Sequence, residues 1–447
     1  MSKHLRQLQR SALTAAFVLC AAVAAFAAFA PFAGDELVLK DKDHKDIGTA
    51  IGNLIEAESK DSKALAKART ALNDLIVKIG KSTKKANDPI GATQAVLALT
   101  NDLGKAIYHV EERKMSGIRP GELAAGTIDD GDDTDKLTYA VWTPKAYKAS
   151  GEPLPLMLFL PGMKEGKPYS AKQFLIENWV DAPIREKAIL VALDMPTDTS
   201  LWNVHRAGDE GRVGGIGIAM RVFGRVSGLY NIDYDRVYLV GVETGLQVAL
   251  RVAGTFPHHF AGVIGQRGDT EDAAWDNLRN VPTWFAGGGS GCTAWEEKTK
   301  AAGFDNCTLQ QDGKDADAWA WAVERKRNAN PAKVNLVLGA PVPFGAYWVL
   351  AEPIEPSPGT RIDAEVDRET NKLTINARGV KRVTVFFNDL MLDLDKPIKV
   401  VCNGVEREEK VARSLDDFLA IAKKRSLCDG GRVYVASKLY DLPPPKD

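Results

Sequence analysis

The sequence predicts an α/β protein with a doubly wound, mostly parallel sheet, preceded by an N-terminal helical hairpin and followed by a small C-terminal β-rich domain. Three observations lead to this expectation. Between residues 137 and 346, short apolar runs ending in Gly or Pro alternate with helix-compatible sequence, as in sheets buried on both faces. Before this region apolar residues recur every three or four positions, and after it short strands alternate with turn residues.

Composition limits the possible classes of protein. The chain has 447 residues, of which 45% are hydrophobic, enough for more than one core. Its 58 Lys and Arg residues nearly balance 59 Asp and Glu, and no basic block is long enough to follow a phosphate backbone. We therefore expect no nucleic-acid partner.

The first segment, residues 1–34, has the pattern of an export signal. A basic start, "MSKHLRQLQR", precedes an uncharged Ala- and Phe-rich run that contains small-x-small steps such as Ala25-Phe26-Ala27. The run also approaches the roughly 20 residues that cross a bilayer, so an uncleaved membrane anchor is the alternative. The sequence thus predicts a periplasmic or extracellular protein, held at the membrane if the segment is not cleaved.

Four cysteines lie beyond this segment: Cys292, Cys307, Cys402 and Cys428. An even number in an exported chain predicts disulfides. We expect Cys292–Cys307 and Cys402–Cys428, because each pair closes a short loop whose ordering stabilises by roughly 3 kcal/mol. Zinc is the competing interpretation, but no C-x-x-C or H-x-x-x-H spacing supports it. We therefore expect neither a metal nor a cofactor.

Residues 35–116 are expected to form the helical hairpin. Apolar residues make two helical stripes: Leu65, Leu72, Leu75 and Ile79, then Val96, Leu99, Leu103, Ile107 and Val110. Between the stripes, Asp88 is placed to cap the second helix and Pro89 fits its first turn. The acidic segment 117–136 is expected to be a linker, since it lacks the glycine and glutamate positions of a calcium loop.

The central region, residues 137–346, is expected to hold the large sheet. Its strands are predicted at "KLTYAVWTP", "LPLMLFLPG", "AILVALDMP", "RVYLVGV", "FAGVIG" and "VPTWFAG". The run "RVYLVGVETGLQVALRVAG" passes from a buried strand into a helix across G-V-E-T-G, the spacing of a G-x-S-x-G nucleophile elbow. Glu243 occupies the serine position.

Together with "YNIDYDRVYLVG" and "FPHHFAGVIG", this elbow resembles the exported α/β-hydrolases of the feruloyl-esterase, polyhydroxyalkanoate-depolymerase and prolyl-oligopeptidase-like group. The resemblance covers roughly Leu137 to Leu338. It implies a serine that attacks an ester or amide carbonyl, a late histidine that takes its proton and an acid that orients the histidine. The expected acid loop instead reads "GGGSGCTAWEE" without Asp, and no histidine follows His259.

The remaining candidates for a site are few. His258 and His259 lie at the far end of the elbow helix, where we expect them at the surface or in a cap. His205, in a loop before the preceding helix, could face the pocket, and so could Ser290, although its frame ends in Cys292 and favours a Gly-rich turn.

The backbone N–H groups of Met163 and Thr244 could still form an oxyanion hole, which the Glu243 carboxylate would then occupy itself. Two functions follow. The favoured one is an exported α/β-hydrolase-fold protein that is catalytically inactive and has a binding or scaffolding role. The alternative is a hydrolase that uses Glu243 as a carboxylate nucleophile, as haloalkane dehalogenases and epoxide hydrolases use Asp, or an unrecognised site.

Residues 347–447 are expected to form the β-rich accessory domain. Strands with turn residues between them accompany a helix that begins at Ser414, with Asp417 in its capping-box position. The region resembles C-terminal modules of exported bacterial hydrolases, which implies binding of a polymer or cell-envelope component. Packing or spacing is the alternative.

Overall fold

The computed structural model describes residues 37–84, 86–110, 119–128, 137–196, 199–202, 206–207, 212–270, 275–339, 345–352, 357–424 and 433–444. The predicted signal or anchor segment lies outside these ranges, as do His205 and Cys428. The chain divides into two units, residues 1–36 and 37–447, and every element below belongs to the second. None of the described helices has the length and apolar character needed to cross a membrane.

Four helices stand where the hairpin was expected: α2 (Asp41–Glu58), α3 (Ser62–Lys84), α4 (Pro89–Leu97) and α5 (Thr100–Tyr108). The predicted cap is confirmed, since Asp88 Oδ1 accepts a hydrogen bond from the Gly91 N–H at 2.9 Å and Pro89 opens α4. The second apolar stripe, however, is divided between α4 and α5. Leu99 leaves the helical conformation with φ −86° and ψ 68°, so one predicted helix becomes two.

The central sheet has eight strands, in the order β1 (Leu123–Ile128), β2 (Leu137–Trp142), β6 (Ile189–Leu193), β3 (Leu154–Leu160), β9 (Ile232–Val242), β10 (Gly262–Gln266), β11 (Thr283–Ala286) and β12 (Cys307–Leu309). β2 is antiparallel to both β1 and β6, and the remaining neighbours are parallel. The doubly wound, mostly parallel sheet is thereby confirmed. Strand β1 lies inside the segment expected as a linker, because residues 123–128 of that segment pair one to one with residues 137–142 of β2.

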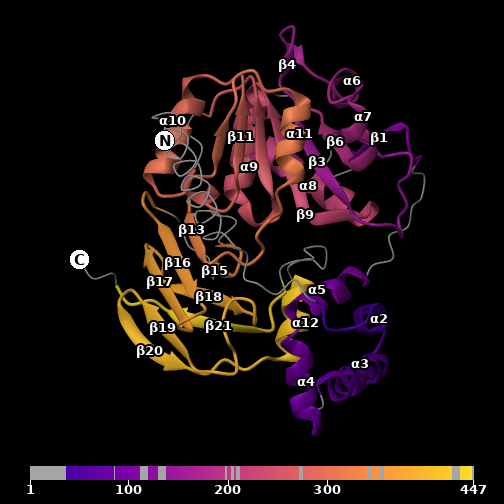
Figure 1. The fold of residues 1–447 in the computed structure, drawn as a ribbon, viewed down its shortest axis with the longest axis vertical. Coiled ribbons are helices and arrows are strands. Elements are labelled where there is room, and N and C mark those ends of the chain that lie inside the picture. The colour runs from indigo at the N-terminus through magenta and orange to yellow at the C-terminus, as the bar shows by residue number, and fades with distance from the viewer. Residues whose placement is uncertain are drawn as a thin grey trace, which may run out of the picture. The chain divides into compact units, whose positions relative to one another are not determined.

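Helices cover both faces of this sheet (Figure 1): α6 (Ala171–Glu177), α7 (Ala182–Lys187), α8 (Gly215–Leu229), α9 (Thr244–Thr255), α10 (Ser290–Ala301) and α11 (Asp315–Val323). Side chains of α8, α9 and α10 share one buried cluster with the strands, and those of α6, α7 and α11 share another. The shorter connecting elements are β4 (Met163–Lys164), β5 (Lys167–Pro168), η2 (Thr199–Leu201), β7 (Arg206–Ala207), β8 (Arg212–Val213), η3 (Pro257–His259) and η4 (Trp275–Leu278).

The C-terminal part contains two sheets and a helix. One sheet orders β13 (Lys333–Val337), β16 (Arg361–Asp367), β17 (Lys372–Arg378), β19 (Ile398–Cys402) and β20 (Val405–Glu409). The other orders β14 (Gly345–Ala346), β15 (Val349–Ala351), β18 (Arg382–Phe387) and β21 (Ala436–Asp441), and α12 spans Leu415–Lys424. Strand β13 precedes the expected boundary at residue 346 yet pairs with β16. Ser414 Oγ accepts the Asp417 N–H at 3.1 Å, as the predicted cap requires.

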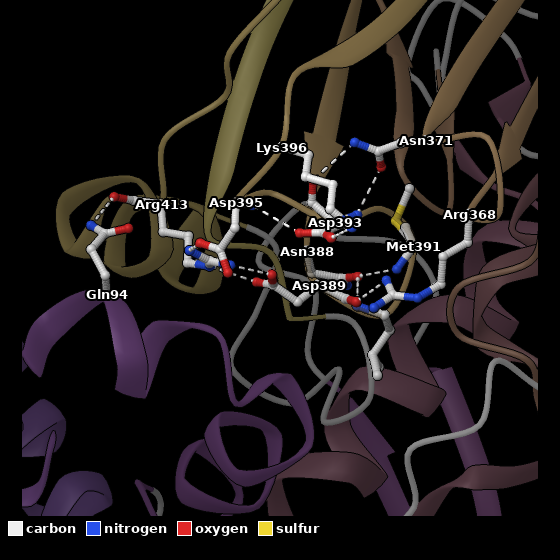
Figure 2. Close-up of polar contacts among 11 residues, drawn as sticks. Gln94, Arg368, Asn371, Asn388, Asp389, Met391, Asp393, Asp395, Lys396 and Arg413 are labelled. Carbon is white, nitrogen blue, oxygen red and sulfur yellow. Dashed lines mark hydrogen bonds and ion pairs between the residues drawn. The ribbon is translucent and has the colours of Figure 1, made fainter. Parts of the chain in front are cut away.

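Arg413 fixes the loop that follows β18 (Figure 2). Its Nε donates to Asp389 Oδ2 at 2.8 Å and its Nη1 donates to Asp395 Oδ1 at 2.7 Å, while its side chain is only 5% exposed. The main-chain oxygen of Arg413 also accepts a hydrogen bond from Gln94 Nε2 at 2.9 Å. One arginine therefore links the accessory sheet region to helix α4.

Candidate functional site

The turn between β9 and α9 has the geometry of a nucleophile elbow. Glu243 lies between the strand and the helix with φ 53° and ψ −121°, a conformation that residues with a side chain rarely adopt. Its N–H donates to the Gln266 oxygen of the neighbouring strand at 2.8 Å. The elbow and the strand order are those of the α/β-hydrolase fold, as the sequence resemblance implied.

Two glycines make this turn possible because the backbone passes very close to neighbouring segments. A Cβ on Gly245 would lie 1.8 Å from the Leu160 oxygen, and a Cβ on Gly241 would lie 2.4 Å from the Leu246 Cα. Both distances are far inside van der Waals contact. The glycines of G-V-E-T-G thus hold α9 against β3 and against its own strand.

A pocket of about 240 Å³ opens above Glu243, and its lining includes Gly162, Met163, Glu165, Tyr169 and Arg267. The Glu243 side chain is 40% exposed, and its Oε1 lies 3.9 Å from Nε of Arg267. Its other oxygen lies over the loop after β3, since a Cβ on Gly162 would be 3.0 Å from Glu243 Oε2. The side chain does not cap α9. The expectation that the N–H groups at the start of α9 bind the Glu243 carboxylate is therefore wrong, and the nearest described cation to this carboxylate is the exposed guanidinium of Arg267.

A small hairpin borders the pocket. Glu165 and Gly166 join β4 to β5 with φ 52° and 75°, the two positive values of a type I′ turn. Lys164 Nζ lies 2.5 Å from Glu177 Oε2 on α6, and the Tyr169 hydroxyl donates to the same oxygen. The hydrogen bond from Lys164, followed by that from Tyr169, lowers the pKa of Glu177 to about 2. The hairpin is thus tied to α6 by charge.

The loops where a triad acid and histidine were sought hold other groups. After β11 the chain continues through Gly287, Gly288 and Gly289. The Asp269 carboxylate, from the loop after β10, lies against these glycines, since a Cβ on Gly289 would be 2.6 Å from Asp269 Oδ2. After β12, Asp315 opens α11, where its two oxygens accept hydrogen bonds from Gln266 Nε2 at 2.9 Å and the Trp179 N–H at 3.0 Å. Both acceptor atoms are therefore occupied by structural bonds.

The other predicted site residues are placed as follows. Met163 lines the elbow pocket and Thr244 is the first residue of α9, so their role as an oxyanion hole stays a prediction. Ser290 is exposed at the start of α10 and is not among the residues lining this pocket, whereas His205 lies outside the described residues. His258 was expected at the surface or in a cap, but it is buried against Tyr347, with ring centroids 6.2 Å apart.

The predicted disulfide between Cys292 and Cys307 is wrong, because both residues are free thiols. Cys292 Sγ faces the Gly268 oxygen at 3.7 Å, whereas Cys307 is the cross-strand partner of Thr283. Burial raises the pKa of Cys292 to about 12 and that of Cys307 to about 11. Cys402 is also a free thiol, and its expected partner Cys428 lies outside the described residues.

Arg267 is the site residue that sequence reasoning missed. It directly follows β10, at the carboxyl edge of the parallel strands, where ligands of open α/β sheets bind. That position in "FAGVIGQRG" was the available clue. Among the residues that the structure places around this pocket, Arg267 and Lys164 supply positive charge and none is a histidine.

No protein-family model matches the chain, and no curated protein matches its sequence significantly. Three solved structures illustrate the similarities at the level of fold. A thermostable esterase is 16% identical, with 46% of this chain and 63% of that chain covered and a TM-score of 0.38. An S-formylglutathione hydrolase from Agrobacterium tumefaciens is 15% identical, with 47% and 98% covered and a TM-score of 0.37. A poly(3-hydroxybutyrate) depolymerase from Bordetella parapertussis is 17% identical, with 45% and 87% covered and a TM-score of 0.34.

Proposed function

We propose that this chain is an exported α/β-hydrolase-fold protein that does not hydrolyse esters and acts through binding or scaffolding. The main support for this proposal is that Glu243 at the elbow lies next to Arg267. A carboxylate cannot supply the alkoxide that a serine elbow supplies. Its neighbour is a guanidinium, which stays protonated at any physiological pH and cannot act as the general base that a triad needs.

The same pairing also weakens the case for a carboxylate nucleophile. That mechanism needs a group that activates water to hydrolyse the ester intermediate, and the described lining of the elbow pocket contains no histidine. A ligand-binding site can use both Glu243 and Arg267, and unlike a hydrolase it does not require a general base.

The proposal is tested by assaying the full chain and its variants on p-nitrophenyl acetate and on feruloyl esters. We expect no turnover above background from the wild type, and little gain from Glu243→Ser, because the base and its orienting acid are absent from their usual loops. Glu165→Gln is the matched control, since Glu165 lines the same pocket away from the elbow. Ester hydrolysis by the wild type that Glu243→Gln abolishes, while Glu165→Gln retains it, would establish the carboxylate-nucleophile alternative.

Export is the second element of the proposal, and the basic start followed by the apolar run of residues 1–34 supports it. Mass spectrometry of the native protein should find a new N-terminus between about Ala24 and Asp35. Intact Met1 in the membrane fraction would indicate an anchor. Intact Met1 on cytoplasmic protein would refute export.

A further inference from the structure

A second hollow, of about 410 Å³, lies on the outer side of the five-stranded sheet and shares no lining residue with the elbow pocket. Its lining includes Arg361, Asp363, Asn376, Arg378, Asn403 and Gly404. Along β16 and β17 these polar positions alternate with fully buried residues, so the polar side chains all point to the outer face. Nothing in the proposed function uses this surface.

Two arginines occupy neighbouring backbone positions at this hollow. Arg361 and Arg378 are direct cross-strand partners in the antiparallel pairing of β16 with β17. Like charges directly opposite each other destabilise a strand pair unless a counter-charge is present. The register therefore places a concentrated positive charge at one end of the two strands.

The one carboxylate in the lining is already used by Arg361. Asp363 Oδ2 accepts from Arg361 Nε at 2.7 Å, and Asp363 Oδ1 accepts from Arg361 Nη2 at 2.7 Å and from Asn335 Nδ2 at 2.5 Å. Within the described part of the chain, no hydrogen bond involves the Nη1 group of Arg361. Among the described residues, no hydrogen bond or ion pair involves the guanidinium of Arg378, which is exposed. Asp363 and, electrostatically, the Asp276 carboxylate raise the pKa of the Arg361 guanidinium. In the part of the chain that the structure describes, the uncompensated positive charge at the hollow is therefore that of Arg378.

The edge of the hollow is rigid. Asn403 and Gly404, with φ 44° and 79°, form the turn between β19 and β20. The Asn403 Oδ1 accepts the Ala377 N–H at 2.8 Å, and its Nδ2 donates to the Ala377 oxygen at 3.2 Å and to the Pro443 oxygen at 2.6 Å. Every polar atom of this amide is thus used to hold the turn against β17 and against Pro443, which follows β21. The amide of Asn376 is exposed on the same face, with a donor and an acceptor to offer.

We propose that this hollow binds the oxyanion of an acidic sugar, a carboxylate or a phosphate, between Arg378 and the Nη1 group of Arg361. A guanidinium presents its N–H groups in a planar fork that matches both kinds of oxyanion. The Asn376 amide offers a donor and an acceptor to a neighbouring hydroxyl, and the volume suits one sugar ring. The accessory domain then anchors the protein to an acidic carbohydrate, independently of what the elbow pocket does.

Isothermal titration calorimetry on the full chain tests this with three probes: glucuronate, glucose 6-phosphate and glucose. We expect one or both charged sugars to bind and glucose not to bind. Arg378→Gln should weaken that binding at least tenfold, and Asn376→Ala should weaken it a few fold. Lys372→Gln is the matched control, because it removes the same charge from the same strand six residues away and should leave binding unchanged.

The charged sugar that binds more tightly identifies the oxyanion. Equal binding of glucose, no binding of either charged sugar to the wild type, or equal affinity of the Arg378→Gln and Lys372→Gln proteins would overturn the proposal. Circular dichroism of each variant shows whether it is folded, and Asn376→Ala supplies the test should Arg378→Gln misfold. Esterase activity plays no part in these readouts, so this outcome is separate from that of the elbow.

Discussion

Glu243 and Arg267 stand side by side because of strand register. Val242 on β9 pairs with Gln266 on β10, and the next residue of each strand turns out of the sheet with a positive φ, 53° for Glu243 and 55° for Arg267. The Glu243 N–H is bonded to the Gln266 oxygen and the Arg267 N–H to the Ala286 oxygen, so both backbones are fixed. Their side chains are 40% and 58% exposed, and such a pair contributes at most about 1 kcal/mol to stability.

Replacing Glu243 with glycine should stabilise the protein. Glycine adopts a positive φ without steric cost, and the strain relieved, about 1–3 kcal/mol, exceeds the roughly 0.4–1 kcal/mol that glycine costs through the entropy of the unfolded chain. Glu243→Gly should therefore raise the free energy of unfolding by about 1 kcal/mol. Urea denaturation measures the change, and Glu243→Gln, which keeps the side-chain length, should lie within about 0.5 kcal/mol of the wild type. A Glu243→Gly protein less stable than Glu243→Gln would show that the turn is not strained.

Adding one methyl group at Gly245 should have the opposite effect. Its Cβ would lie 1.8 Å from the Leu160 oxygen and 2.7 Å from the Leu160 carbon, so α9 must move from β3 and we expect a loss of more than about 3 kcal/mol. Gly224→Ala in α8 is the control, because no atom lies within 4 Å of its added Cβ and alanine favours a helix by about 1 kcal/mol. Thermal unfolding should therefore separate the two substitutions in opposite directions.

The ion pair of Arg413 should matter far more than an exposed pair. Arg413→Ala leaves the Asp389 carboxylate, whose pKa is raised by burial, without its cation, and we expect a loss of about 3–5 kcal/mol. Lys423→Ala removes an exposed contact with Glu58 and should change stability by less than about 1 kcal/mol. Similar losses in the two variants by denaturant unfolding would contradict this assignment.

Acid should loosen the hairpin of β4 and β5 at a pH set by Glu177. The folded-state pKa of Glu177, about 2, lies below its usual value of 4.5, so its stabilising effect is complete above 4.5 and is lost as the pH falls toward 2. Unfolding measurements between pH 5 and 2 should show this decline in the wild type and a smaller one in Glu177→Gln. Equal slopes in the two proteins would mean that Lys164 and Tyr169 do not hold the carboxylate.

The thiols of Cys292 and Cys307 should be unreactive in the native state. Burial raises their pKa values to about 12 and about 11, so the thiolate is scarce at pH 8. We expect slow labelling by iodoacetamide in buffer and rapid labelling after denaturation, with peptide masses that show reduced cysteine. A mass lower by two hydrogens on a linked peptide containing both residues would restore the predicted disulfide.

The sheet could be predicted from the sequence because each central strand is marked by its own short run of apolar residues. Runs such as Leu154–Leu160 and Ile189–Leu193 are almost uniformly apolar, and a strand covered on both faces needs no other information. The elbow was equally visible, since its two glycines stand where the backbone cannot tolerate a Cβ. Local sequence therefore suffices where local sterics and burial determine the structure.

Contacts between distant segments explain what the sequence could not reveal. Leu123–Ile128 becomes a strand only because β2 offers it an edge, and His258 is buried because Tyr347, far along the chain, covers it. Arg267 comes beside Glu243 through the pairing of β9 with β10, which no spacing along the chain encodes. The even number of cysteines predicted disulfides, but a count does not determine whether two sulfur atoms face each other, and Cys292 and Cys307 are free thiols.

The glycines at 241 and 245 have a consequence for how such sequences evolve. They set how closely a helix approaches a sheet, so selection for a folded protein preserves them whether or not a reaction takes place at the turn between them. The residue at position 243 can therefore change while the flanking glycines stay. The two glycines of the elbow thus indicate the fold, and only the side chain at position 243 indicates whether the turn can catalyse a reaction.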